Sequence, residues 1–231
     1  MSTQALPGIS VVLPALDEEG NVARAVNAAR DAARRCAADV EVIVVDDGSS
    51  DGTAAEAERA GAHVVRHDRN HGYGAALRSG FAVATQPWIF QMDCDNQFDP
   101  EELDKLVARS DTAQVVIGVR SPRADPWPRV AAGRAWNMLC RIAFGNLARD
   151  IDCGFKLIDR TVVSGGGLRS DGACISVELC LAARDAGCTI AEVDVGHRPR
   201  TAGSATGLNP RVAARGLLEL ARLRLTYRRR R

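Results

Sequence analysis

Short apolar runs alternate with longer amphipathic segments along this chain, and that alternation limits its fold more than any other feature. Between the first two apolar runs, Val22, Val26 and Ala29 recur at the spacing of one helix face. Apolar strands separated by such helices are typical of βα units around a parallel sheet. The sequence therefore predicts an α/β fold in which helices flank a mainly parallel sheet. The candidate strands cover residues 9–13, 40–45, 62–65, 88–92, 115–118, 154–158 and 189–193.

The helices predicted between these strands begin near residues that are typical of helix N-termini. Asp51, Gly52 and Thr53 offer N-cap chemistry, and Pro100 stands near the first turn of a later helix. Three prolines between residues 121 and 128 disfavour a helix and predict an exposed loop. Predicted helices cover residues 22–33, the segment after Asp51, and residues 74–84, 100–109 and 175–186, while residues 201–207 form a predicted mobile loop.

The last part of the chain is predicted to form a basic amphipathic helix. Over residues 211–227, leucine and alanine share one broad face and arginines fall opposite. Further arginines occupy residues 228–231. We therefore expect one domain over residues 1–207, followed by a basic helix and tail over residues 208–231. That helix can close the domain core or lie on an anionic membrane surface, and both interpretations stay open at this point.

Composition excludes several classes of protein. With 231 residues, 46% of them apolar and 26% charged, the chain is globular in character and neither disordered nor fibrous. A net charge of +1 gives no general reason to expect binding to nucleic acid. Seven cysteines without a CxxC pair favour neither a disulfide framework nor a structural zinc site, so reduced, cytosolic thiols are expected. No stretch approaches the roughly 18 apolar residues that cross a bilayer, so we expect a cytoplasmic protein without spanning helices.

Acidic residues directly follow the first two predicted strands. The first strand runs into Pro14 and the acidic segment 17–19, and the second runs into Asp46 and Asp47. Ligands of open α/β sheets bind at the carboxyl ends of neighbouring strands, where these residues would meet. The same residue types are common in turns and helix caps, so these segments alone leave both interpretations open.

A second acidic pair follows the fourth strand. Asp93 and Asp95 are two residues apart, and in an extended backbone such side chains point to the same side. The two carboxylates can therefore converge on one cation. Magnesium prefers few carboxylates together with water and substrate phosphates, so the pair predicts a diphosphate-metal site. The alternative is a solvated acidic loop.

The segment 71–80 carries a glycine pattern that is a near miss of a dinucleotide-binding motif. It follows the third strand instead of the first, and the next strand ends in Asp93 and Asp95, which argues against a dehydrogenase. We expect these glycines to allow close backbone approach, with Arg78 or the helix N-terminus facing phosphate.

Together, these segments resemble the family 2 glycosyltransferases of the GT-A fold, and most closely the polyprenyl-phosphate branch with its dolichyl-phosphate mannose and glucose synthases. The resemblance extends to DCGFKL at residues 152–157 and to HRPR at residues 197–200, which Gly203 and Ser204 follow. It covers most of residues 9–207 and implies a Rossmann-like, mainly parallel sheet flanked by helices. Membrane-spanning helices, which many relatives have, are absent from this sequence.

The resemblance implies a donor site built from the strand ends. Asp47 would contact the base of a UDP- or GDP-linked sugar. Arg200 would reach the diphosphate when the loop at Gly203 and Ser204 closes over it, and arginine suits this role because its planar fork pairs with phosphate oxygens. The donor would be held by Pro14, Glu18, Asp46, Asp47, Asp93 and Arg78, and a Mg²⁺ or Mn²⁺ ion by Asp93, Asp95 and Gln97.

The resemblance also implies an acceptor site. Arg120 and Arg134 would hold an anionic acceptor, although either arginine alone is as well explained as a surface residue. Asp152 and Glu178 are candidate general bases, and Glu178 is equally consistent with an acid in the first turn of a helix. We expect His197 to pack or to form hydrogen bonds. The residues expected to act in catalysis are Asp95, Arg200 and Asp152.

The implied reaction moves a hexose from a nucleoside-diphosphate sugar to polyprenyl phosphate with inversion. The phosphate oxygen is anionic near neutral pH, because its second pKa is about 6, so no strong base is needed. A soluble family 2 enzyme that glycosylates a hydroxyl of a small metabolite or glycan would need such a base. A non-catalytic accessory subunit that binds nucleotide sugars is the third alternative. For the lipid acceptor, the C-terminal helix predicts peripheral attachment on the inner face of a membrane.

Overall fold

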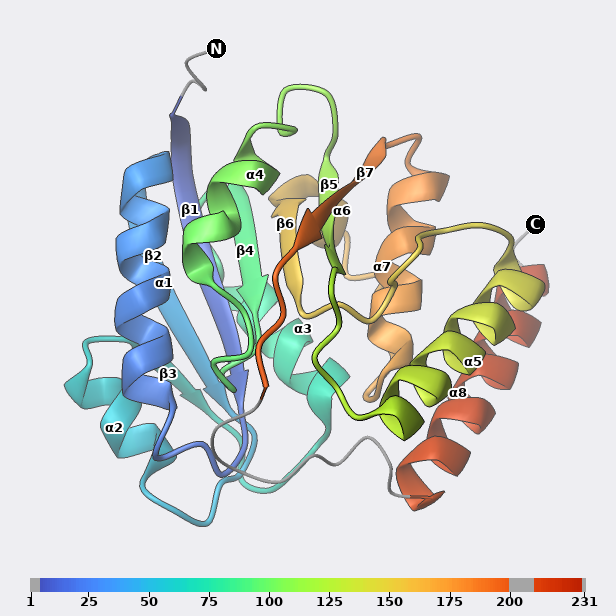
Figure 1. The fold of residues 1–231 in the computed structure, drawn as a ribbon, viewed down its shortest axis with the longest axis horizontal. Coiled ribbons are helices and arrows are strands. Elements are labelled where there is room, and N and C mark those ends of the chain that lie inside the picture. The colour runs from blue at the N-terminus through green and yellow to red at the C-terminus, as the bar shows by residue number, and fades with distance from the viewer. Residues whose placement is uncertain (1–4, 200–209, 230–231) are drawn as a thin grey trace.

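A mixed sheet runs through the centre of the molecule and is covered by helices (Figure 1). The computed structural model describes residues 5–199 and 210–229. Its strands are β1 (Leu6–Ala15), β2 (Ala37–Asp46), β3 (His63–Arg66), β4 (Trp88–Met92), β5 (Val115–Arg120), β6 (Phe155–Asp159) and β7 (Ile190–Val195). The seven strands are ordered β3-β2-β1-β4-β6-β5-β7. Among them β6 is antiparallel to both of its neighbours, and the other pairings are parallel.

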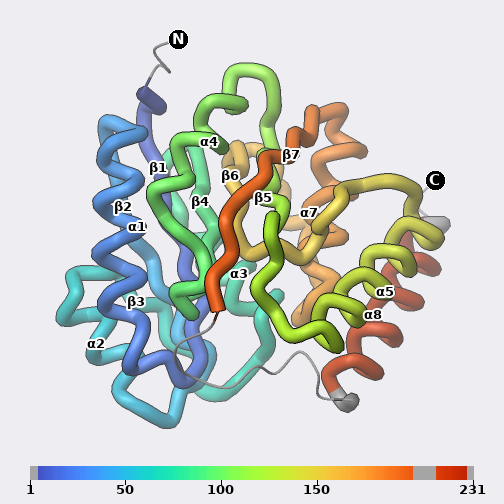
Figure 2. The backbone as a smooth tube through the Cα atoms, viewed as in Figure 1, coloured from blue at the N-terminus to red at the C-terminus, as the bar shows by residue number. Residues whose placement is uncertain are grey.

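Helices cover both faces of this sheet, as Figure 2 shows. The helices are α1 (Val22–Cys36), α2 (Thr53–Arg59), α3 (Tyr73–Val83), α4 (Leu103–Val107), α5 (Trp127–Phe144), α6 (Arg160–Val163), α7 (Cys174–Asp185) and α8 (Pro210–Arg229), with a 3-10 turn at Pro100–Glu102. On one face α1 packs with α4, and on the other α3 packs with α7. This layering buries the central strands on both sides, which explains their continuous apolar runs.

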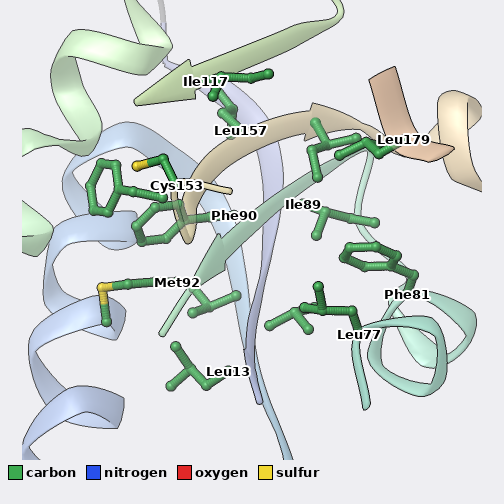
Figure 3. Close-up of a cluster of buried hydrophobic side chains, with 14 of the residues drawn as sticks. Leu13, Leu77, Phe81, Ile89, Phe90, Met92, Ile117, Cys153, Leu157 and Leu179 are labelled. Atoms are coloured by element: carbon green, nitrogen blue, oxygen red, sulfur yellow. The ribbon is translucent and has the colours of Figure 1, made fainter. Parts of the chain in front are cut away.

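The core lies between the central strands and these helices (Figure 3). Leu13 of β1 and Phe90 of β4 have no exposed surface, and Leu77 of α3 is 1% exposed. The Phe90 ring meets the Phe155 ring of β6 edge to face, with 4.9 Å between the ring centroids. This packing gives the carboxyl ends of β1, β2 and β4 a rigid foundation.

The structure confirms all seven predicted strands, the predicted helices and the mainly parallel sheet. The largest element that the sequence patterns did not predict is α5. Residues 121–128 do contain a loop, but a helix begins at Trp127 with Pro128 in its first turn, where proline is tolerated. Only Cys140 and Phe144 of this helix are buried. Because so few of its positions face the core, α5 lacks the apolar stripe by which a helix is recognised.

Helices α5 and α8 lie side by side at one edge of the molecule (Figures 1 and 2). The predicted apolar face of α8 is mostly exposed: Leu220 is buried, whereas Leu217 and Leu218 are 49% and 60% exposed. In the part of the chain that the structure describes, the exposed large apolar side chains belong to these two helices: Trp127, Met138, Leu139, Ile142, Val212, Leu217, Leu218 and Leu225. None of the described helices has both the length and the hydrophobicity that a membrane span requires.

Candidate active site

The loops after β1 and β2 are tied together at the carboxyl edge of the sheet. The Asp47 backbone N–H donates to the Ala15 carbonyl at 2.9 Å. The Glu18 N–H donates to the Thr53 hydroxyl at 2.8 Å, and Asp17, at a φ of 53°, accepts from the Ser50 N–H. The prediction that these acidic segments meet at neighbouring strand ends is therefore confirmed.

Three acidic residues of these loops, Glu18, Asp46 and Asp47, are buried, whereas Asp17 and Glu19 are exposed. Glu18 accepts from Asn21, and Asp46 accepts from the Ser49 N–H at 3.1 Å. Pro14 is a buried residue of β1, opposite Val45 of β2. A donor nucleotide would therefore meet a preorganised edge, and the binding roles of Pro14, Glu18 and Asp46 stay predictions.

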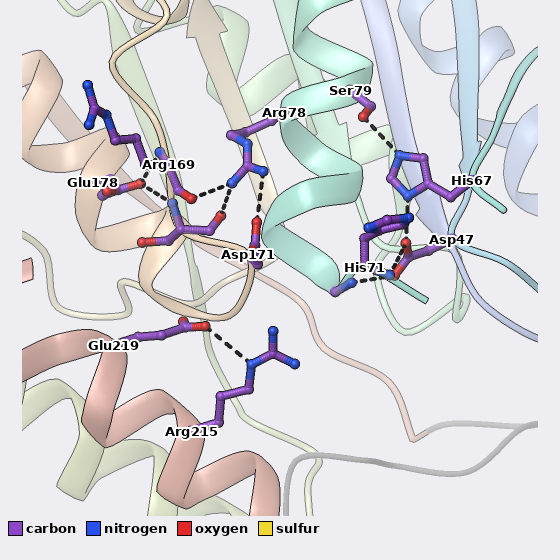
Figure 4. Close-up of polar contacts among 12 residues, drawn as sticks. Asp47, His67, His71, Arg78, Ser79, Arg169, Asp171, Glu178, Arg215 and Glu219 are labelled. Atoms are coloured by element: carbon purple, nitrogen blue, oxygen red, sulfur yellow. Dashed lines mark hydrogen bonds and ion pairs between the residues drawn. The ribbon is translucent and has the colours of Figure 1, made fainter. Parts of the chain in front are cut away.

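Asp47 organises the segment that leads from β3 to α3 (Figure 4). One carboxylate oxygen lies 2.6 Å from Nδ1 of His67 and accepts from the His71 N–H at 2.9 Å. The other oxygen accepts from the Gly72 N–H at 2.8 Å. Asp47 is only 4% exposed, and both of its carboxylate oxygens are occupied by contacts within the chain. Contact between Asp47 and a base stays a prediction.

The start of α3 is occupied by another segment of the chain. The Asp171 carbonyl accepts from the Gly74 N–H at 2.8 Å. A Cβ at Gly72 would stand 2.4 Å from that carbonyl oxygen, so no other residue fits without a shift. The close backbone approach expected at these glycines is therefore confirmed, since the backbone of residues 170–172 fills the space that they leave. A phosphate contact from this helix N-terminus stays a prediction.

Arg78 of α3 holds the same segment. Its guanidinium donates to the Arg169 and Ser170 carbonyls, at 2.6 Å each, and pairs with Asp171 at 2.8 Å. Figure 4 shows Arg78 and Asp171 facing each other. A phosphate contact from Arg78 stays a prediction.

Asp93 and Asp95 follow β4 in a turn. The strand ends at Met92, and Asn96 takes a φ of 57°. The expectation that an extended backbone aligns the two carboxylates is therefore wrong. Burial and the negative charge of the neighbouring Asp95 raise the pKa of Asp93. The Asp93 carboxylate accepts from the Tyr73 hydroxyl at 2.8 Å.

A divalent cation fits the chemistry of this pair. Among the described residues, no three Cys, His, Asp or Glu side chains are grouped so that they could hold a metal ion by themselves. Two carboxylates that repel each other are suitable protein ligands for Mg²⁺, which takes its remaining ligands from water and substrate phosphates. The Gln97 amide nitrogen donates to the Arg198 carbonyl at 3.0 Å, which leaves the Gln97 oxygen as a further ligand.

The segment after β7 lies against this turn. The Arg198 N–H donates to the Gln97 carbonyl at 2.7 Å, and the Gly196 N–H donates to the Glu102 carboxylate at 2.6 Å. The His197 ring packs against Phe98 with 5.3 Å between centroids, which confirms the expected packing role. Arg200, Gly203 and Ser204 lie outside the described residues.

The two predicted acceptor arginines have different surroundings. Arg120 pairs with Asp150, and both side chains are 10% exposed. Arg134 is exposed on α5 and takes no part in that pair. Sequence reasoning missed Asp150, because only its distance to Arg120 identifies it. Holding an acceptor stays a prediction for both arginines.

The two candidate bases also differ. Burial raises the pKa of Asp152 to about 6, although Lys156 and Arg120 oppose the shift. Oδ1 of Asp152 is buried and has no hydrogen-bond partner within the described chain. Glu178 lies in the second turn of α7 and not the first, and it accepts from the Arg169 and Ser170 N–H groups at 2.7 and 2.8 Å. Glu178 is therefore a loop anchor.

Lys156 and Tyr73 are further site residues to which sequence reasoning gave no role. Lys156 has no exposed surface and donates to the Cys153 carbonyl. Its charge lowers the pKa of both Asp93 and Asp152, so it partly compensates the acidic cluster. Lys156 belongs to the segment 152–157 and Tyr73 to the segment 71–80. A lysine within an apolar strand pattern gives no sign that it is buried, and a tyrosine beside glycines gives no specific functional signal.

Comparisons with known proteins identify the family and the fold of this chain. A model of the family "Glycosyl transferase family 2" matches residues 10–166. An undecaprenyl-phosphate 4-deoxy-4-formamido-L-arabinose transferase from Enterobacter sp. (strain 638) is 34% identical over 167 residues, which cover 69% of this chain and 51% of that protein. The chain thus spans about half the length of this curated relative.

Two solved structures share the architecture. Mannosyl-3-phosphoglycerate synthase from Rubrobacter xylanophilus has a TM-score of 0.78 at 20% identity, over 96% of this chain and 75% of that one. Glucosyl-3-phosphoglycerate synthase from Mycobacterium tuberculosis, in complex with Mn²⁺, UDP-glucose and glycerol 3-phosphate, has a TM-score of 0.71 at 23% identity, over 93% and 80%. These likenesses show the fold and confirm the predicted GT-A architecture.

Proposed function

This chain belongs to glycosyl transferase family 2, and on that premise we propose that it transfers a hexose from a nucleoside-diphosphate sugar to a polyprenyl phosphate with inversion. The observation that carries the proposal is the gathering of carboxylates at the carboxyl ends of β1, β2 and β4. The name of the Enterobacter relative, which specifies undecaprenyl phosphate, supports this class of acceptor.

The donor diphosphate would bind beside the turn that holds Asp93 and Asp95. A Mg²⁺ or Mn²⁺ ion held by these carboxylates and Gln97 would neutralise charge on the departing diphosphate. The Mn²⁺ and UDP-glucose named for the mycobacterial structure support a metal and a nucleotide sugar. Arg200 follows Pro199 directly in the sequence, and the described chain up to Pro199 runs against this turn. We propose that Arg200 pairs with the same diphosphate.

An acceptor that is already ionised needs neither of the two candidate bases. The Glu178 carboxylate already accepts hydrogen bonds from the backbone N–H groups of residues 169 and 170. Asp152 is half-buried, and the charge of Lys156 lowers its pKa against the effect of burial. A polyprenyl phosphate oxygen attacks without losing a proton to either of them, whereas an alcohol requires a base. For an alcohol acceptor, Asp152 would be that base.

Arg134 has more of its guanidinium available to an acceptor than Arg120 has. Arg120 uses Nε and one terminal nitrogen on Asp150, so only its other terminal nitrogen remains for an acceptor phosphate. Arg134 is exposed and keeps its whole fork. We propose that Arg134 binds the acceptor phosphate directly, while Arg120 contributes positive charge and helps to shape the site.

We propose that α5 and α8 attach the protein to the inner, cytoplasmic face of a membrane. Exposed apolar side chains gather on these helices, and α5 carries arginines without any acidic residue. Apolar burial and attraction to anionic lipid act together at such a surface. The apolar part would rest on Trp127, Met138, Ile142, Leu218 and Leu225. The side chains of residues 228–231 lie outside what the structure describes, and their contribution stays a prediction.

A soluble family 2 glycosyltransferase is the second candidate. The acceptors in the names of the two phosphoglycerate synthases are small and anionic, which supports this reading of the fold. The third candidate is an accessory subunit without activity, which would retain the donor-binding residues at the sheet edge and no catalytic site. Because the acidic residues of that edge are all present, we rank it last.

One experiment separates these candidates. The purified chain is incubated with Mg²⁺ and a panel of UDP- and GDP-sugars, with polyprenyl phosphate, 3-phosphoglycerate or a neutral sugar as the acceptor. We expect transfer to polyprenyl phosphate alone. Transfer to a small acceptor would establish the soluble enzyme, and binding of a nucleotide sugar without any transfer would establish the accessory subunit.

A further inference from the structure

The hydroxyl of Tyr73 stands between two polar side chains near the proposed metal site, the buried Gln91 and the half-buried Asp93. It lies 2.8 Å from Oδ1 of Asp93 and 3.0 Å from the amide nitrogen of Gln91, which is 1% exposed. A carboxylate can only accept, so the tyrosine proton must go to Asp93. Gln91 must then present its NH₂ group. The hydrogen bonds run in one direction, from Gln91 through Tyr73 to Asp93.

The second oxygen of Asp93 is confined as well. A Cβ at Gly154 would stand 2.0 Å from Oδ2 of Asp93, so the carboxylate lies directly against the backbone of residue 154. The Asp93 N–H also donates to the Gly154 carbonyl at 3.2 Å. With one oxygen held by Tyr73 and the other against Gly154, the carboxylate has one orientation.

Tyr73 is itself held in place by its neighbours along the chain. It is the first residue of α3, between Gly72 and Gly74, and both glycines lie against the loop at residues 169–172. Arg78 reaches from the second turn of α3 back to that loop, as Figure 4 shows. The loop therefore clamps the start of α3 at the position from which Tyr73 reaches Asp93.

We propose that Tyr73 is a positioning residue that holds the Asp93 carboxylate in the orientation in which it binds the divalent cation of the donor complex. The inference rests on the proposed function, because it takes Asp93 as a metal ligand. It goes beyond that function by giving a role to a residue that touches neither donor nor acceptor in the proposal.

The chain offers a matched control in its other tyrosine. The Tyr227 hydroxyl donates to Asp185 at 2.6 Å and accepts from the Arg184 guanidinium at 2.8 Å. Tyr227→Phe therefore removes the same kind of hydroxyl, between an aspartate and a nitrogen donor, away from Asp93. It measures what the loss of such a hydroxyl does to the fold alone.

The test is Mn²⁺ affinity, measured from the electron paramagnetic resonance signal of free Mn²⁺ with saturating UDP and, separately, saturating GDP. We expect Tyr73→Phe to weaken Mn²⁺ binding about tenfold, the scale of one hydrogen bond to a charged group. Tyr227→Phe should leave it unchanged. Transfer by Tyr73→Phe should recover at high Mn²⁺ concentration, which a general loss of structure would not allow.

Three results would decide against the proposal or against its premise. Unchanged Mn²⁺ affinity in Tyr73→Phe, with loss in Asp93→Asn, would overturn the role of Tyr73 and leave the metal site standing. Equal weakening in both tyrosine variants would also overturn it. Unchanged affinity in Asp93→Asn would remove the metal site itself. If Tyr73→Phe does not fold, Gln91→Met tests the same hydrogen bonds, with an expected weakening of about threefold.

Discussion

Arg120 and Asp150 form a two-point pair, with Nε 2.7 Å from one carboxylate oxygen and a terminal nitrogen 2.6 Å from the other. The Arg120 backbone N–H also donates to this carboxylate at 3.2 Å. The pair therefore fastens the end of β5 to the segment before β6. It also lowers the pKa of Asp150 against the effect of burial, which by itself raises that pKa.

This pair predicts that Arg120 matters first for stability. Arg120→Ala should lower the free energy of unfolding by about 3–5 kcal/mol, because it leaves a largely buried carboxylate uncompensated. Arg134→Ala removes an exposed arginine and should change it by less than about 0.5 kcal/mol. Urea denaturation measures both. If Arg120→Ala is as stable as the parent and only the acceptor KM rises, Arg120 is a binding residue after all.

The second prediction concerns the metal. Asp95→Ala should abolish transfer, with a loss of several kcal/mol in transition-state stabilisation, because an oxygen ligand and its charge disappear. Asp39→Ala, at an exposed position on β2, serves as the control. Circular dichroism checks that the fold survives. Full activity in EDTA, with negligible residual metal, would contradict a metal-dependent reaction.

A third prediction tests Arg200 by kinetics. Arg200→Ala should lower kcat more than it raises the donor KM, provided that its contact strengthens as charge develops on the diphosphate. Initial rates over a range of donor concentrations separate the two constants. Arg198→Ala is the matched control, since Arg198 pairs with Asp99. A change confined to KM would make Arg200 a ground-state binding residue.

The raised pKa of Asp152 predicts a pH-dependent cost to folding. Its pKa is about 6 in the folded chain, against an ordinary value of 3.8. The folded state therefore holds the proton more tightly, and stability falls as pH rises from about 4 to 6. At the scale of 1.36 kcal/mol per pKa unit, the loss is on the order of 3 kcal/mol.

Asp152→Asn should remove this loss. The variant should gain stability relative to the parent between pH 4 and pH 7, as measured by urea denaturation at both values. Asp111→Asn, at an exposed position, is the control for the substitution itself. Parallel stability curves for parent and Asp152→Asn would show that burial does not hold the proton on Asp152.

The fifth prediction tests the proposed membrane surface. Arg222→Ala on α8 should weaken co-sedimentation with anionic vesicles about fivefold, which corresponds to about 1 kcal/mol per basic residue near the surface. Arg24→Ala, an exposed arginine of α1, should have no effect. Removal of residues 228–231 should weaken binding further, and added salt should weaken it in every variant. Equally poor binding to zwitterionic and anionic vesicles at low salt would favour a soluble acceptor.

Most of the architecture follows from local patterns in the sequence. Each strand is an apolar run of the right length, and a helix such as α1 shows its buried face as a period in Val22, Val26 and Ala29. The placement of Asp46 and Asp93 at strand ends follows from the same reasoning, because a polar residue after a buried run marks the point where the chain leaves the core.

Other features depend on contacts between distant segments and left no local signal. The direction of β6, between β4 and β5, depends on pairing across the sheet. The glycines at the start of α3 suggest a ligand in the sequence, yet they accommodate a loop about a hundred residues away in the chain. Helix α5 escaped prediction because only Cys140 and Phe144 of its residues are buried.

Local sequence patterns account for the order of the strands and of most helices, for the gathering of acids at one sheet edge and for the family. Hydrophobic periodicity and short motifs each extend over only a few neighbouring residues, so they can be recognised in the sequence without the fold. The orientation of Asp93, the pairing of Arg120 with Asp150 and the loop contacts of Glu178 follow from the folded structure alone. Those outcomes depend on which polar groups meet when distant segments are buried together, because a buried charge or N–H takes whatever partner the fold brings within reach.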